Sequence, residues 1–163
     1  GEAGAGRVGV GGIKYVDLHR NRESGDQVSG EKMWASNGEA ATYVQDAGAR
    51  IRGIFRRGES SRESRRDEAP AIVLEDDAGR ALAMALNRFA DAVDITVVER
   101  RPNVLTGYLF ETANTFSPFY NTCSVLKEED PARRLSRLAL CDLAARVFET
   151  GLELLGIASC DQM

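Results

Sequence analysis

From about residue 39 onward, apolar residues recur every three or four positions, a spacing that predicts amphipathic helices rather than strands. Four such stripes follow one another, bounded by Val44–Ile54, Leu82–Val93, Leu105–Tyr120 and Leu135–Leu154. We place the second helix from Ile72 or Asp77 to Val93. Pro102 and Pro131 precede the last two stripes, and proline is favoured as the first residue of a helix. Gly58 and Gly156 follow the first and last stripes as predicted helix ends. Residues 39–163 are therefore expected to form an all-α helical bundle.

The first 38 residues follow another pattern and hold most of the 16 glycines. Val8 and Val10 alternate with glycine, which predicts a short strand, and the stretch from Ile13 to Leu18 predicts a brief helix. Too few apolar residues occur here for a separate core. We therefore expect residues 1–38 to be a short irregular α/β arm and residues 39–163 to be the helical domain.

Composition narrows the possible functions. The chain has 163 residues and a formal net charge of -4, which excludes a uniformly basic nucleic-acid binder but not a local basic patch. Three cysteines without a CxxC spacing argue against a zinc site, so we expect no metal. One histidine, His19, leaves little room for histidine-based catalysis. The absence of a long apolar run or a secretory signal predicts a cytoplasmic protein with no membrane partner.

A local basic patch is the most informative charge feature. Seven arginines stand against three acidic residues between Asp46 and Arg66, a local charge of +4. Arginine forks match phosphate geometry, so this patch can hold an RNA backbone. Tyr43 and Tyr120 are candidates to stack on unpaired bases. The alternatives stay open at this point: the arginines as a solvated helix face, and each tyrosine as a core or boundary residue.

Gly4, Gly6 and Gly9 spell the GxGxxG pattern of dinucleotide-binding loops. Such a loop needs a strand before it and a helix after it, and nothing precedes these glycines. We interpret them as part of the arm, and we expect no cofactor to bind this chain.

Four blocks of sequence, in order, resemble arginyl-tRNA synthetases, which are class I aminoacyl-tRNA synthetases. The blocks are GGIKYVDLHRNR (Gly11 to Arg22), EKMWASNGEAATYVQDAGARIRGIFRR (Glu31 to Arg57), YLFETANTFSPFYNTCSVL (Tyr108 to Leu126) and the closing stretch from Ala132 to Met163. The first resembles the stretch after the family's ATP-binding loop. The others resemble the helical DALR-type anticodon-binding domain, up to its closing L-G-I and terminal methionine.

This resemblance implies the C-terminal part of an arginine–tRNA ligase, with residues 1–38 as the end of a linker from a catalytic domain that is not in this chain. The full enzyme would use ATP and Mg²⁺ to activate arginine. No catalytic residue is expected here. The implied partners are arginine-accepting tRNA and the catalytic domain, in a monomeric protein that does not bind DNA.

Residue by residue, Tyr43 and Arg50 match family positions that face the anticodon loop, Tyr120 matches the family's F-Y pair, and Met163 matches the terminal methionine near the anticodon pocket. We expect the tyrosines to stack on bases and four arginines to contact the RNA backbone: Arg50, Arg52, Arg56 and Arg57. Asp46 departs from the family, which usually has a tyrosine there, and Gly48 replaces the usual histidine. An acid near the phosphates repels RNA.

Two alternatives remain open. One is a non-catalytic tRNA-binding module built from the same domain. The other is a helical interaction protein that no longer binds RNA, which Asp46, Gly48 and the negative net charge favour slightly. Salt-dependent tRNA binding would exclude the helical interaction protein.

Overall fold

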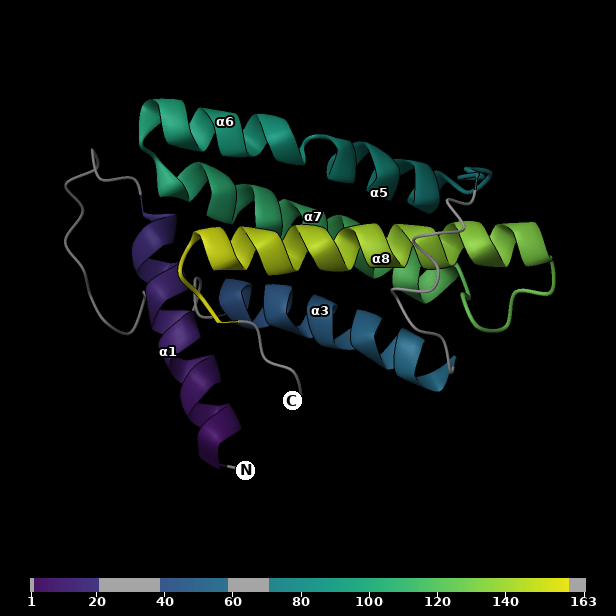
Figure 1. The fold of residues 1–163 in the computed structure, drawn as a ribbon, viewed down its shortest axis with the longest axis horizontal. Coiled ribbons are helices and arrows are strands. Elements are labelled where there is room, and N and C mark those ends of the chain that lie inside the picture. Colours follow the sequence, from purple (N-terminus) through teal and green to yellow (C-terminus); the bar gives the residue numbers. More distant parts are fainter. Residues whose placement is uncertain (1, 21–38, 59–70, 159–163) are drawn as a thin grey trace.

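The computed structural model describes residues 2–20, 39–58 and 71–158, which form helices and no strand within those ranges (Figure 1). The helices are α1 (Glu2–His19), α3 (Glu39–Arg57), α5 (Asp77–Asn87), α6 (Phe89–Glu99), α7 (Pro102–Thr122) and α8 (Pro131–Leu154). Helix α7 contacts each of the other described helices, and α3 and α5 also pack against α8. The expected all-α bundle is confirmed.

Proline and glycine mark the helix ends that the sequence predicted. Pro102 and Pro131 are the first residues of α7 and α8. The Asp130 side chain caps α8 by accepting hydrogen bonds from the backbone N–H groups two and three positions on. At the other end, Gly156 has a φ of 68°, which glycine adopts without strain. The N–H of Ile157 then donates to a carbonyl five residues back, which completes a Schellman motif.

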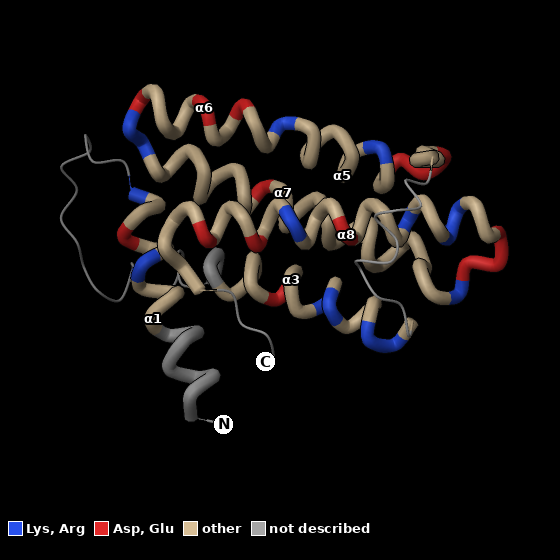
Figure 2. The backbone as a smooth tube through the Cα atoms, in the orientation of Figure 1, with Lys and Arg blue, Asp and Glu red and all other residues tan. Residues whose placement is uncertain are grey.

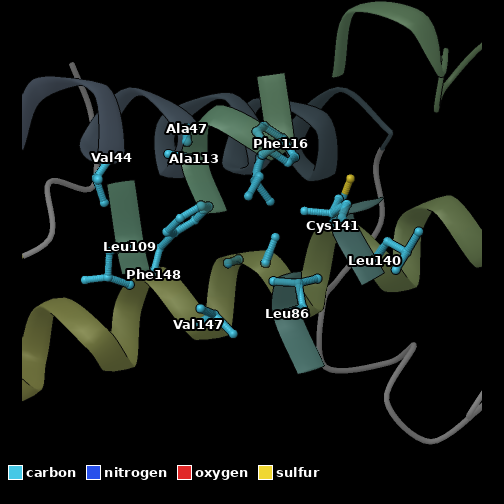
Figure 3. Close-up of a cluster of buried hydrophobic side chains, with 14 of the residues drawn as sticks. Val44, Ala47, Leu86, Leu109, Ala113, Phe116, Leu140, Cys141, Val147 and Phe148 are labelled. Atoms are coloured by element: carbon cyan, nitrogen blue, oxygen red, sulfur yellow. The ribbon is translucent and has the colours of Figure 1, made fainter. Parts of the chain in front are cut away.

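The hydrophobic core lies between α3, α7 and α8. Figure 3 shows Val44 and Ala47 of α3 on one side of the cluster and Val147 and Phe148 of α8 on the other. The predicted stripe of α3 is entirely buried, which confirms its periodicity. Leu154, predicted to continue the stripe of α8, is instead 58% exposed. Leu152, two positions earlier, is buried instead. Because a helix turns by about 200° over two residues, Leu154 lies on nearly the opposite side of α8 from Leu152.

The expected arm is wrong for its first half, because residues 2–19 form the continuous helix α1. The strand predicted at residues 8–10 is absent. Tyr15 and Val16 are buried in the helix, and the Tyr15 hydroxyl donates to the backbone carbonyl of Thr106 on α7 at 2.5 Å. Packing against α3 and α7 thus outweighs the low helix propensity of the glycines. The rest of the arm, residues 21–38, lies outside the described residues.

The predicted second helix is two helices, α5 and α6, that meet at Arg88. The Arg88 N–H donates to the carbonyl of Ala85, three residues back, at 3.2 Å. This single turn of 3₁₀ type interrupts the α-helical ladder without breaking the apolar stripe, which is why spacing alone did not show it. Helix α5 begins at Asp77, the later of the two predicted starts, and α6 continues to Glu99, beyond the predicted end.

Candidate functional site

Positive and negative residues alternate over much of the described chain, but a few stretches carry mostly one sign (Figure 2). The second half of α3 carries four arginines: Arg50, Arg52, Arg56 and Arg57. The last two lie in the final turn, where they complement the negative end of the helix dipole. Acidic side chains gather at the turn between α7 and α8 and at the start of α5. The net charge of -4 therefore conceals a basic surface on α3.

Tyr120, at the end of α7, faces this basic half of α3. Its ring centroid lies 5.9 Å from that of the buried Phe116. The guanidinium carbon of Arg50 lies over the Tyr120 ring, 5.4 Å from the centroid, a cation–π geometry. An Arg57 guanidinium nitrogen lies 3.5 Å from the Tyr120 hydroxyl. We call Arg50, Arg57, Phe116 and Tyr120 the Tyr120 cluster; it joins three of the residues predicted to contact RNA.

Asp46 adds a carboxylate one helical turn before Arg50. The Arg50 Nε lies 2.7 Å from an Asp46 carboxylate oxygen, and the two side chains are 38% and 39% exposed. A solvated pair at this helical spacing contributes only about 0.3–0.5 kcal/mol to stability. The same Arg50 guanidinium thus contacts both the Asp46 carboxylate and the Tyr120 ring.

Tyr43 lies along the same seam between α3 and α7, two helical turns before Arg50. Its hydroxyl donates to Ser117 Oγ on α7 at 2.7 Å, and its ring meets Phe110 edge-on at 6.0 Å between centroids. The side chain is half-buried. These contacts show Tyr43 as a boundary residue of the two helices, and its contact with a base stays a prediction.

The other predicted contacts do not join the Tyr120 cluster. Arg52 faces α8, where a guanidinium nitrogen lies 4.0 Å from the Glu149 carboxylate, and its side chain is 23% exposed. Arg56 is exposed at the end of α3. Met163 lies outside the described residues, so its predicted place near the anticodon pocket stays a prediction.

Sequence reasoning missed Gln45, a polar residue within the buried face of α3. Its side chain is 4% exposed, and neither amide atom has a hydrogen-bond partner among the described residues. It faces Gly11 of α1, where an added Cβ would lie 3.0 Å from the amide nitrogen. A cavity of about 10 Å³ beside it, lined also by Gly48 and Phe148, is the size of one water molecule. Gln45 follows Val44, which belongs to the predicted apolar stripe of α3. This position in the sequence was the signal that could have indicated its burial.

Other candidates for chemistry form no site in the described part of the chain. Gly4, Gly6 and Gly9 lie within helix α1 rather than in a loop that could cradle a phosphate. Burial raises the pKa of the Cys141 thiol to about 12, so it stays protonated at neutral pH. The described ranges hold no cluster of three or more metal-ligating side chains. None of the helices described has both the length and the apolar character of a membrane span.

Residues 44–163 match the DALR anticodon binding domain, and the chain belongs to that family. Its curated relatives include an arginine–tRNA ligase from Synechocystis, 43% identical over 157 residues, and one from Trichodesmium erythraeum, 41% identical over 156 residues. Each match covers 96% of this chain and 26% of the relative. The chain therefore spans about a quarter of the length of these ligases.

Solved structures agree with this assignment. The arginyl-tRNA synthetase of Thermus thermophilus superimposes with a TM-score of 0.80 at 29% identity, over 96% of this chain and 26% of that one. The Plasmodium falciparum enzyme matches in fold, with a TM-score of 0.76 at 24% identity, over 96% of this chain and 27% of that one. The resemblance drawn from the four sequence blocks is confirmed.

Proposed function

We propose that this chain is the tRNA-binding part of an arginine–tRNA ligase and that it holds the anticodon stem–loop of arginine-accepting tRNA against the seam between α3 and α7. The observation that carries this proposal is the Tyr120 cluster. It combines an aromatic ring on a buried support with two guanidinium groups, beside the arginine-bearing half of α3. Splayed bases in RNA loops are bound by aromatic rings and arginine planes, and the phosphates by positive charge.

Each predicted contact has a role in this proposal. Arg56 and Arg57, at the exposed end of α3, contact phosphates. Tyr120 stacks in the loop together with Arg50, and Tyr43 contacts the RNA with the exposed part of its half-buried ring. Arg52 binds RNA less strongly than Arg56 and Arg57 because Glu149 offsets its charge. Met163 completes the base contact with its thioether.

The chemistry of the ligase is assigned to the part of the protein outside this chain. ATP and Mg²⁺ would be bound there, because the one glycine pattern that suggests a phosphate loop is helical here. We assign no catalytic residue to this chain. We further propose a monomeric cytoplasmic ligase in which this domain is joined to the catalytic domain. A reducing compartment suits the free, buried thiols of Cys123 and Cys141.

The test is equilibrium binding of the 163-residue chain to an arginine-accepting tRNA and to a tRNA for another amino acid, over a salt series. We expect tighter binding of the first tRNA and a steep fall with salt. Arg56→Ala should lower the slope of log K against log[salt] by about 0.7–0.9 for both tRNAs, the value for one lost phosphate contact. Arg88→Ala removes the same charge from the exposed junction of α5 and α6 and is the matched control.

Tyr120 supplies the test of specificity. Tyr120→Leu removes the ring, and we expect a loss of about 5–100-fold for the arginine tRNA, the usual value of one stacked base. Tyr120→Phe keeps the ring and should retain most of the affinity. Equal, weak binding of both tRNAs would leave only electrostatic attraction and contradict the proposal. No binding at low salt would favour a helical interaction protein.

A further inference from the structure

The Tyr120 ring is already covered by another planar group in the structure. Phe116 supports it from the core, and the Arg50 guanidinium lies over the ring at 5.4 Å. Its hydroxyl is in contact with Arg57. A base that approaches this face of Tyr120 therefore meets the Arg50 guanidinium before it meets the aromatic ring.

Asp46 determines what kind of group Arg50 presents to RNA. Its carboxylate lies 2.7 Å from Arg50 Nε, on the same face of α3. The carboxylate offsets part of the Arg50 charge and repels an approaching phosphate, so the pair attracts a phosphate less than an unpaired arginine does. The flat faces of the guanidinium do not take part in this pairing, because its hydrogen bonds lie in its plane. They remain suited to stacking.

We propose that Arg50 acts as a base-stacking plane, positioned over Tyr120 by Asp46, and not as a phosphate contact. This inference rests on the proposed function and names the contact through which the Tyr120 cluster binds a loop base. Arg50 touches the base. Asp46 acts through Arg50 and is a positioning residue.

The experiment separates the plane of Arg50 from its charge. Arg50→Lys keeps the positive charge and removes the planar group. Asp46→Asn keeps the size of the side chain and removes the carboxylate. Arg88→Lys, the same change at the exposed junction of α5 and α6, is the control. The probe is the anticodon stem–loop of an arginine-accepting tRNA that carries 2-aminopurine at one loop position at a time, because stacking quenches its fluorescence.

We expect the unsubstituted chain to quench one loop position strongly. Arg50→Lys should lose that quenching and bind about 5–100-fold more weakly, the usual value of one stacked base, with an unchanged salt slope. Asp46→Asn should weaken the quenching, because the guanidinium is no longer held in place. It should also steepen the salt slope by about 0.7, because Arg50 becomes free to pair with a phosphate. Arg88→Lys should behave like the unsubstituted chain.

The outcomes distinguish this inference from the proposed function. If the chain binds and quenches the stem–loop but Arg50→Lys does so equally well, Arg50 is a phosphate contact and the stacking role is wrong. A salt slope that Asp46→Asn leaves unchanged would refute the role of Asp46. If the unsubstituted chain binds no arginine stem–loop even at low salt, the proposed function itself fails. Thermal melts of all variants report on folding, and both substituted side chains are partly exposed, so the fold should persist.

Discussion

Helices α7 and α8 approach each other closely at Gly151, and this contact predicts the effect of adding one methyl group. A Cβ at position 151 would lie 2.6 Å and 3.0 Å from the two methyl carbons of Leu109 on α7. Leu109 is completely buried in the core that Figure 3 shows, so its methyl groups can move only by shifting against other buried side chains. We expect Gly151→Ala to destabilise the fold despite alanine's better helix propensity.

The magnitude follows from two opposing effects. Overpacking a close-packed core costs about 1–3 kcal/mol. Replacing glycine by alanine inside a helix returns about 1 kcal/mol. Because the 2.6 Å contact is far inside van der Waals distance, the cost of overpacking should fall in the upper part of its range. The expected net loss for Gly151→Ala is about 1–2 kcal/mol in the free energy of unfolding.

Gly107→Ala is the matched control, because this glycine also lies inside a helix, α7, and an added Cβ meets nothing within 4 Å. It should gain about 0.5–1 kcal/mol. Urea unfolding followed by circular dichroism measures both changes. The two variants should move the midpoint in opposite directions at similar m-values. A stabilised Gly151→Ala protein would refute the reasoning, since it would mean that Leu109 repacks freely.

Two other predictions concern polar groups outside the candidate interface. Arg137 is 8% exposed and binds Glu128 at 2.5 Å and Asp76 at 3.0 Å, so Arg137→Ala should lower stability by about 2 kcal/mol in the same unfolding assay. The expected loss of stability is smaller than for a fully buried ion pair, because Asp76 remains 43% exposed. Unchanged stability of the Arg137→Ala protein would contradict this prediction. Burial lowers the pKa of His19 below 6.5. The unfolded chain then binds more protons than the folded chain between the two pKa values, so stability is lost as pH falls through that window. The single histidine gives one NMR titration, whose midpoint should lie below 6.5; His19→Gln should remove this component of the acid sensitivity.

Helix boundaries were predictable where local residues decide them. Pro102 and Pro131 begin helices because proline suits the first helical position, and Gly156 ends one because it adopts a positive φ. Helix α1 was not predictable from local preference. Its glycines disfavour a helix, and its burial depends on Tyr15 packing against α7, a contact between residues about 90 positions apart in the sequence. The 3₁₀ turn at Arg88 left the apolar spacing intact and so gave no signal.

The residues of the candidate site were predictable from the sequence, but their arrangement in space was not. Resemblance and residue type selected Arg50 and Tyr120 separately, and their spacing in the sequence carries no information about contact. The arrangement of Arg50 over Tyr120 arises only when α3 packs against α7. Asp46 was noted as a departure that repels RNA. The structure adds that its carboxylate is paired with Arg50, and the proposed positioning role rests on this contact.

The measurement that tests the central claim most directly is a map of the surface that RNA protects. Hydrogen–deuterium exchange of the chain is measured with and without the anticodon stem–loop of an arginine-accepting tRNA. A stem–loop of the same length from another tRNA is the control. We predict slower exchange in the second half of α3 and the last turns of α7, and no change in α5 and α6. Protection confined to α5, α6 or α8 would contradict the account, because the RNA would then bind away from Tyr120 and the arginines of α3.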